Sequence, residues 1–146
     1  MKKFLIILVS LILVGCSNKK TINYDSVKKN LNDDFKGFDV MDVSTLENNY
    51  SVEGSAFKSS LIVMDNTSTK SKMYAIFEAN DDFEDAEYEA DSFIKKYKEA
   101  WGLGYFPEEA KLVEDSKKEI YGNYIIYVVS KNNEDIINKI KNSTES

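Results

Sequence analysis

The chain contains no histidine and no arginine, and Cys16 is its single cysteine. Ser–His and Cys–His catalysis both need an imidazole base beside the nucleophile, and zinc sites are built mainly from Cys and His. Those classes of site are therefore excluded, and one cysteine cannot form a disulfide within the chain. The sequence predicts no catalytic residue, no metal site and no cofactor.

Glycine is scarce and basic residues are in the minority. The six glycines are scattered, so the chain has no glycine-rich phosphate-binding loop. Acidic residues outnumber lysines by 25 to 19, which gives a formal net charge of −6. Surfaces that bind nucleic acid need an excess of basic side chains to neutralise phosphates. No nucleic-acid partner is therefore expected.

The N-terminus has the pattern of a bacterial secretory signal. Lys2-Lys3 precede an apolar run of about 11 residues that ends at Val14, and Gly15 and Cys16 follow. The run has the length of a signal-peptide core, ~7–15 residues, and is shorter than the ~20 residues that span a bilayer. The small residue before Cys16 resembles the cleavage site of bacterial lipoproteins. The sequence predicts a signal peptide over residues 1–15 and a Cys16 that carries diacylglycerol and palmitate-type acylation at the start of the mature protein.

Two other interpretations of this segment stay open: an uncleaved transmembrane anchor, or an ordinary signal peptide beside an unrelated cysteine. Lipid attachment is favoured because the charge, the run length, the small residue and the cysteine occur in the expected order. At ~0.8 kcal/mol per buried CH₂, two or three acyl chains hold a domain stably on a membrane. We therefore expect the protein on the outer, extracytoplasmic face of the cell membrane, which it contacts through the lipid on Cys16.

The predicted mature chain is acidic and forms one domain. Removing residues 1–15 takes away two of the 19 basic residues and none of the 25 acidic ones, so the net charge moves from −6 to −8. Residues 16–25 are polar and predict a tether, and residues 26–146 predict a single globular domain.

The domain begins with helical patterns. After Asp25 or Ser26 as N-cap, a short helix that Gly37 ends places three apolar residues on one face, namely Val27, Leu31 and Phe35. A second helical turn is expected around residues 44–49. Gly54 closes this section.

A hairpin and a long helix follow. Residues 60–64 and 72–77 are apolar and β-prone, and residues 65–70 between them favour a turn. Asp81 with Glu84 forms a capping box, after which apolar residues recur at helical spacing as far as Trp101. This long helix should pack on the sheet, with Trp101 as a packing anchor.

The last third repeats the same plan. A helical turn is expected at Pro107, then a strand over residues 112–121 and a reversal at Gly122-Asn123. Residues 124–129 are apolar on both faces, which predicts a central strand. Asn132 or Asn133 should cap a final helix whose isoleucines face inward, at Ile136, Ile137 and Ile140, and the polar tail beyond Lys141 should fray. The prediction is an α+β two-layer sandwich: a mainly antiparallel four-stranded sheet in a ββαββα plan, packed by helices and preceded by a short N-terminal helix.

Two stretches of this last third resemble a known family. They are Gly104-Tyr105-Phe106-Pro107-Glu108-Glu109-Ala110-Lys111-Leu112-Val113-Glu114 and Tyr121-Gly122-Asn123-Tyr124-Ile125-Ile126-Tyr127-Val128-Val129-Ser130. Together with the preceding hairpin and long acidic-to-basic helix, they resemble domain of unknown function 4358 from about Phe38 onward. The resemblance implies a small lipid-anchored bacterial protein with no assigned activity. It implies no site residue.

The acidic residues of the long helix are best interpreted as a solvated face. They are Asp82, Glu84, Asp85, Glu87, Glu89 and Asp91. Residues 80–85 lack the glycine and the terminal glutamate of an EF-hand loop, so a calcium site there is a weaker alternative. Residues 65–67 have the same ambiguity and better fit a turn.

The nine tyrosines allow either a core or a binding surface. Tyr124 and Tyr127 point to opposite faces of one strand. If one sheet face is uncovered, Tyr74 or Tyr127 could form a patch for a partner or a glycan. We favour core positions, because a strand that is apolar on both faces is usually covered on both.

Two functions remain. The first is a non-enzymatic binding or accessory domain at the cell envelope, which meets a protein or cell-wall partner through a sheet face or through the loop from Trp101 to Pro107. The second is a carboxylate-dependent hydrolase that acts on an envelope glycan or another extracellular substrate. The sequence favours the binding domain.

Overall fold

The computed structural model describes residues 19–102 and 104–144. Its centre is one antiparallel five-stranded sheet in the order β1-β2-β3-β5-β4. The strands are β1 Asp39–Val40, β2 Phe57–Met64, β3 Met73–Ala79, β4 Lys117–Tyr121 and β5 Tyr124–Val129. The predicted hairpin between residues 60 and 77 is confirmed as β2 and β3, and the second hairpin as β4 and β5.

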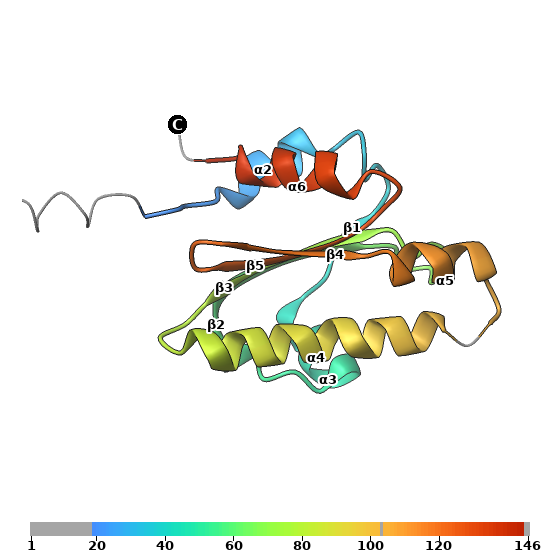
Figure 1. The fold of residues 1–146 in the computed structure, drawn as a ribbon, viewed down its shortest axis with the longest axis horizontal. Helices are drawn as coiled ribbons and strands as arrows, with labels where there is room; N and C mark the ends of the chain where they lie inside the picture. The colour runs from blue at the N-terminus through green and yellow to red at the C-terminus, as the bar shows by residue number, and fades with distance from the viewer. Residues whose placement is uncertain (1–18, 103, 145–146) are drawn as a thin grey trace, which may run out of the picture.

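Helices cover both faces of this sheet (Figure 1). The helices are α2 Tyr24–Asn30, α3 Val43–Tyr50, α4 Phe83–Trp101, α5 Pro107–Glu114 and α6 Asn133–Lys141, with a 3₁₀ turn, η2, at Gly54–Ala56. α3 and α4 lie on one face and α2 and α6 on the other, while α5 lies at one end of the sheet. None of the described helices has the length and apolarity that crossing a bilayer requires.

The predicted α+β class, antiparallel sheet and helical packing are confirmed, and two details differ. A fifth strand, β1, adds two residues at the edge, where Val40 pairs with Val63 of β2. Helices on both faces also make three layers where two were expected. The reason is that β3 and β5 carry apolar side chains on both faces, and each face must be buried.

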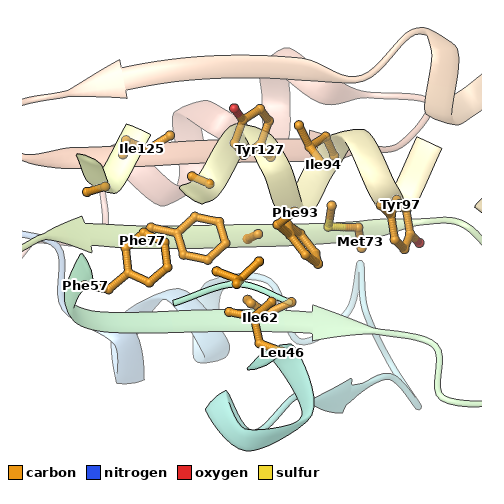
Figure 2. Close-up of a cluster of buried hydrophobic side chains, with 14 of the residues drawn as sticks. Leu46, Phe57, Ile62, Met73, Phe77, Phe93, Ile94, Tyr97, Ile125 and Tyr127 are labelled. Carbon is orange, nitrogen blue, oxygen red and sulfur yellow. The ribbon is translucent and has the colours of Figure 1, made fainter. Parts of the chain in front are cut away.

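Each face of the sheet has its own core. On the α4 face, Phe93 packs edge-on against Phe77 of β3, with ring centroids 5.8 Å apart, and Figure 2 shows Phe93 and Tyr97 reaching from α4 toward the sheet. On the opposite face, Tyr74 packs against Phe35 at 4.8 Å. Tyr127 is buried in the first core and Tyr124 in the second, so the expected core positions of these tyrosines are confirmed.

The first helix begins earlier and ends sooner than predicted. Asn23, not Asp25 or Ser26, caps it, because the Asn23 side chain accepts a hydrogen bond from the Ser26 N–H at 3.0 Å. After Asn30 the chain continues in turns to Gly37, whose φ of +84° suits glycine. The predicted apolar face is nevertheless buried, at Val27, Leu31 and Phe35.

The C-terminal tail is hydrogen-bonded to the end of the predicted tether and to α2. The Asn23 N–H donates to the Ser143 carbonyl at 2.8 Å, and the Asn30 amide donates to the Ser143 hydroxyl at 2.8 Å. Ser143 is buried, so the expectation that the tail frays beyond Lys141 is wrong at this residue. Ile22 is buried as well, which places the last residues of segment 16–25 against the domain.

Two further element boundaries differ from the prediction, and one predicted helical turn is confirmed. The N-cap of α4 is Asp82 rather than Asp81, since the Asp82 carboxylate accepts from the Asp85 N–H at 3.1 Å. The strand predicted over residues 112–121 begins at Lys117, because α5, started by Pro107 at its first position, continues to Glu114. The helical turn predicted at residues 44–49 is confirmed as α3.

Candidate binding groove

An aromatic groove lies where α4 ends. Five aromatic side chains line a hollow of about 240 Å³ there, namely Tyr50, Tyr97, Trp101, Tyr105 and Phe106. They come from α3, from the last turns of α4 and from the loop before α5. The β2–β3 turn contributes the opposite rim, with Asp65 and Ser68. We call this hollow the aromatic groove.

A row of neighbouring, mutually tilted rings extends from the core to this groove. Phe93, Tyr97 and Trp101 follow each other at i, i+4 on α4, with ring centroids 6.0 and 6.4 Å apart, and Phe106 lies 6.1 Å beyond Trp101. Residues four apart on a helix share one face, so the sequence spacing alone brings the first three together. Phe93 is fully buried, whereas Phe106 is 47% and Tyr105 83% exposed. The row therefore ends in apolar surface that faces solvent.

Hydrogen bonds hold the inner wall of the groove. The buried Tyr97 hydroxyl donates to the Ser71 carbonyl at 2.7 Å, and burial raises the pKa of Tyr97. Burial likewise raises the pKa of Tyr50. The Lys96 ammonium donates to the Tyr50 carbonyl at 2.5 Å, which fastens the end of α3 to α4. Both tyrosines thus stay neutral and fixed at ordinary pH.

The acidic rim is a rigid turn built around Asp65. The Asp65 carboxylate accepts hydrogen bonds from the backbone N–H groups of Thr67, Thr69 and Lys70 at 3.1, 3.1 and 2.9 Å. The slight burial of Asp65 would raise the pKa of its carboxyl, but the hydrogen bonds from Thr67 and Thr69 outweigh it and hold the pKa well below its usual range. Asp65 is therefore a carboxylate at any physiological pH, and the predicted turn at residues 65–70 is confirmed.

The aromatic groove continues into a second hollow of about 400 Å³ beside β1, and this second hollow is acidic. Both hollows share Tyr50, Met64, Asp65 and Ser68. The second adds Asp39 and Asp42, together with Val40, which is exposed. Among the described residues that line the two hollows, every charged side chain is an aspartate. The apolar groove thus has a negative rim.

The structure places the predicted site residues as follows. Cys16 and residues 1–15 lie outside the described residues. Trp101 is half-buried and packs on the core, as predicted, and it also lines the groove. Within residues 19–102 and 104–144, no three His, Cys, Asp or Glu side chains come together in a way that could hold a metal ion.

The acidic face of α4 is solvated with one exception. Glu89 is only 9% exposed, and its carboxylate accepts a hydrogen bond from the Glu53 N–H at 2.9 Å. Glu87 and Asp91 pair with Lys118 of β4 at 2.6 and 2.9 Å. The prediction that these acids form a solvated face was therefore wrong for Glu89. The helical pattern of the sequence does not show that Glu53, just before η2, packs over this side chain.

The residues that form the groove were only partly visible in the sequence. The loop from Trp101 to Pro107 was predicted as a contact surface, but its exposed pair, Tyr105 and Phe106, was not singled out. Two aromatic side chains between Gly104 and Pro107, outside any periodic run, were the available signal. Tyr50 had no such signal, since only the packing of α3 on α4 brings it to the groove.

Comparison with known families adds one result. The sequence profile of the family "Domain of unknown function (DUF4358)" matches residues 23–130. The chain belongs to this family. The DUF4358 match begins before Phe38, where the resemblance was expected to start, and it takes in α2, all five strands and every residue of the aromatic groove. No curated protein and no solved structure matches the chain.

Proposed function

We propose that this DUF4358 protein is a lipid-anchored accessory domain on the outer face of the cell membrane, where it binds a partner protein through the aromatic groove. The observation that carries the proposal is the exposure of Tyr105 and Phe106 beside a preformed aromatic hollow. Aromatic side chains offer a large contact area at low entropic cost, which is why they are enriched where proteins bind each other.

Charge indicates what kind of segment the partner presents. The described lining of the groove and of the adjoining hollow carries aspartates and no lysine. A segment with lysine or arginine beside an apolar side chain would fill the hollow and meet the negative rim. The net charge of −6 for the whole chain would attract the same partner over a longer range.

The position of the groove suits such a role. The chain just before α2 is hydrogen-bonded to the C-terminal tail, through Asn23 and Ser143. In Figure 1, α4 runs from the end of the molecule where the described N-terminal segment lies to the opposite end, beside α5. The 19 residues of α4 span about 28 Å at 1.5 Å per residue. With a lipid on Cys16, three residues before Lys19, the groove would face away from the bilayer.

The state of Asp65 excludes this residue as the general acid of a carboxylate-dependent hydrolase. This aspartate lies at the junction of both hollows, but its hydrogen bonds and its lowered pKa keep it ionised. A glycoside hydrolase needs one carboxyl that stays protonated near neutral pH to act as general acid. Asp65 instead acts as a fixed negative acceptor that shapes the turn.

Site-specific photocrosslinking in the producing cells tests the proposal. A photoreactive phenylalanine analogue replaces Tyr105 in one strain and Tyr88 in the other, since Tyr88 is also exposed, at 68%, but lies in the first half of α4. We expect a discrete protein adduct from position 105 and none from position 88, and we expect Asp42→Lys to weaken the adduct. Equal labelling at both positions, or a glycan adduct only, would contradict the proposal.

A further inference from the structure

A second hollow, of about 280 Å³, lies at the same end of the molecule and has the opposite charge character. Three lysines line it, namely Lys70, Lys72 and Lys131. The chain around them is acidic overall, with a net charge of −6. We call this hollow the lysine pocket.

The sheet brings the three lysines together. Lys70 ends the β2–β3 turn, Lys72 immediately precedes β3, and Lys131 follows β5 by two residues. β3 and β5 are antiparallel neighbours in which Met73 pairs with Val129. The residue before Met73 and the residues after Val129 therefore lie at the same end of the sheet. The pocket therefore forms from segments that are some 60 residues apart, and its lysines are held by the strand register.

The carboxylates of the pocket are already engaged. Glu109 accepts hydrogen bonds from the Ser71 N–H and hydroxyl at 2.6 and 2.7 Å. Asp34 pairs with Lys139 at 2.9 Å, and its backbone carbonyl accepts from the Lys72 ammonium. None of the ion pairs between described residues includes Lys70, Lys72 or Lys131.

Lys72 forms the half-buried centre of this group. Its ammonium lies 4.6 Å from the centroid of the Phe35 ring. Burial lowers the pKa of Lys72, Asp34 opposes this effect, and the neighbouring Lys70 and Lys139 lower the pKa further. A negative ligand between the lysines would relieve the repulsion that these ammonium groups exert on each other.

We propose that the lysine pocket binds a small phosphate ester. Lys70, Lys72 and Lys131 line the pocket from two segments, the residues before β3 and the loop after β5, and the tetrahedral phosphate of a monoester offers three oxygens to ammonium donors, where a carboxylate offers two. Leu112 and Ile136 give the pocket an apolar wall for the organic part of the ester. Asn132 also lines the pocket, and its side chain makes no capping hydrogen bond with α6. The inference is independent of the partner proposed for the aromatic groove.

Calorimetry on the full chain tests this site. The protein, reconstituted in phosphatidylcholine nanodiscs, is titrated with glycerol 3-phosphate, with glycerol and with acetate. We expect saturable binding of glycerol 3-phosphate, which glycerol and acetate do not reproduce. Binding of acetate as strong as that of the phosphate ester, or no saturable binding at all, would overturn the proposal.

Matched lysine variants locate the ligand. In the double variant Lys70→Gln/Lys131→Gln, binding should weaken by about tenfold or more, since each lost charge-assisted hydrogen bond has a substantial cost. Both side chains are exposed, so the variant should keep its circular dichroism spectrum and unfolding midpoint. The double variant Lys29→Gln/Lys95→Gln removes two exposed lysines elsewhere and should bind as the original chain does. Equal losses in both double variants would mean general charge attraction and would refute the site.

The source of the phosphate is distinguished by the membrane used. Nanodiscs that contain phosphatidylglycerol present an anionic phosphodiester as a lipid headgroup, with two free phosphate oxygens where glycerol 3-phosphate has three. If the pocket takes soluble esters, glycerol 3-phosphate should bind equally in both kinds of nanodisc. We expect this because the pocket is lined by residues at the start of α6, and in Figure 1 α6 starts at the end of the molecule opposite the described N-terminal segment. If lipid headgroups occupy the lysine pocket, phosphatidylglycerol in the nanodisc should reduce the binding of glycerol 3-phosphate to the original chain. The pocket would then still be a phosphate site, but its ligand would come from the membrane.

Discussion

Tyr97 of α4 and Ser71, just before β3, are joined by a hydrogen bond of 2.7 Å from the tyrosine hydroxyl to the backbone carbonyl. Ser71 also donates its N–H and its hydroxyl to Glu109 of α5. One buried residue thus ties two helices to the central strand. Tyr97 lines the aromatic groove and Glu109 lines the lysine pocket, so this junction forms the wall between the two hollows.

Tyr97→Phe should lower the free energy of unfolding by about 1–2 kcal/mol, because the buried Ser71 carbonyl loses its side-chain donor. Urea unfolding of the full chain in non-ionic detergent, followed by the fluorescence of the single tryptophan, Trp101, measures the change. Tyr88→Phe is the control, since its exposed hydroxyl should matter by less than about 0.5 kcal/mol. Equal effects of the two substitutions would show that the Tyr97 hydrogen bond contributes nothing.

Glu89→Ala should cost about 1–3 kcal/mol of unfolding free energy, since it leaves the Glu53 N–H without its acceptor. Glu89→Gln retains a side-chain oxygen and should cost clearly less. Glu99→Ala, at an exposed position near the other end of the same helix, serves as the control and should stay within about 0.5 kcal/mol. The same urea unfolding experiment compares all three variants, and a harmless Glu89→Ala would rule out a structural role for this hydrogen bond.

Asp65 should make stability fall in acid. Its folded-state pKa lies below the unfolded value of about 3.9, so the ionised carboxylate stabilises the fold above that pH, and the contribution is lost as the pH falls through the folded-state pKa. We expect the stability difference between the original chain and Asp65→Asn to shrink as the pH is lowered below about 4. Unfolding midpoints measured from pH 6 downward test this.

The control for this titration is Asp33→Asn, which changes an exposed aspartate that makes no ion pair or side-chain hydrogen bond within the described part of the chain. Its stability difference from the original chain should not follow the same pH course. A difference for Asp65→Asn that is independent of pH would contradict the role assigned to the hydrogen-bonded carboxylate.

Cys16→Ala should abolish lipid attachment and release the protein from the membrane fraction, because the thiol is the atom that would carry the diacylglycerol. Labelling cells with a fatty-acid analogue, followed by fractionation, measures both effects. Ser17→Ala is the matched control and should change neither. Unchanged membrane retention of Cys16→Ala would contradict the lipid anchor.

Several elements could be predicted from local patterns alone. The β2–β3 and β4–β5 hairpins, α4 and α6 follow from alternating or helical apolar spacing and from turn residues such as Gly122-Asn123. The burial of Tyr124 and Tyr127 on opposite faces follows from the two-residue period of a strand. The predicted boundaries were wrong at two places. At the start of α4, two neighbouring aspartates can each act as N-cap, and Asp82 does so. Before Lys117, the eight-residue helix α5 takes up the first residues of the predicted strand.

The functional features depended on contacts between distant parts of the chain. Glu89 belongs to a charged helical pattern, yet its carboxylate accepts a hydrogen bond from the N–H of Glu53, which lies 36 residues earlier in the chain. Tyr50 enters the aromatic groove because α3 packs on α4, and Lys131 lines the same pocket as Lys70 because β3 pairs with β5.

The amino-acid order thus sets the type and sequence of the elements, since these depend on residues close together in the chain. It also sets the acidic charge and the single cysteine on which the proposed lipid anchor depends. The aromatic groove and the lysine pocket arise from packing and strand register. Tyr97 and Trp101 share the local pattern of one helix face, but the other residues of the two hollows come from separate segments that the packing of helices on the sheet brings together.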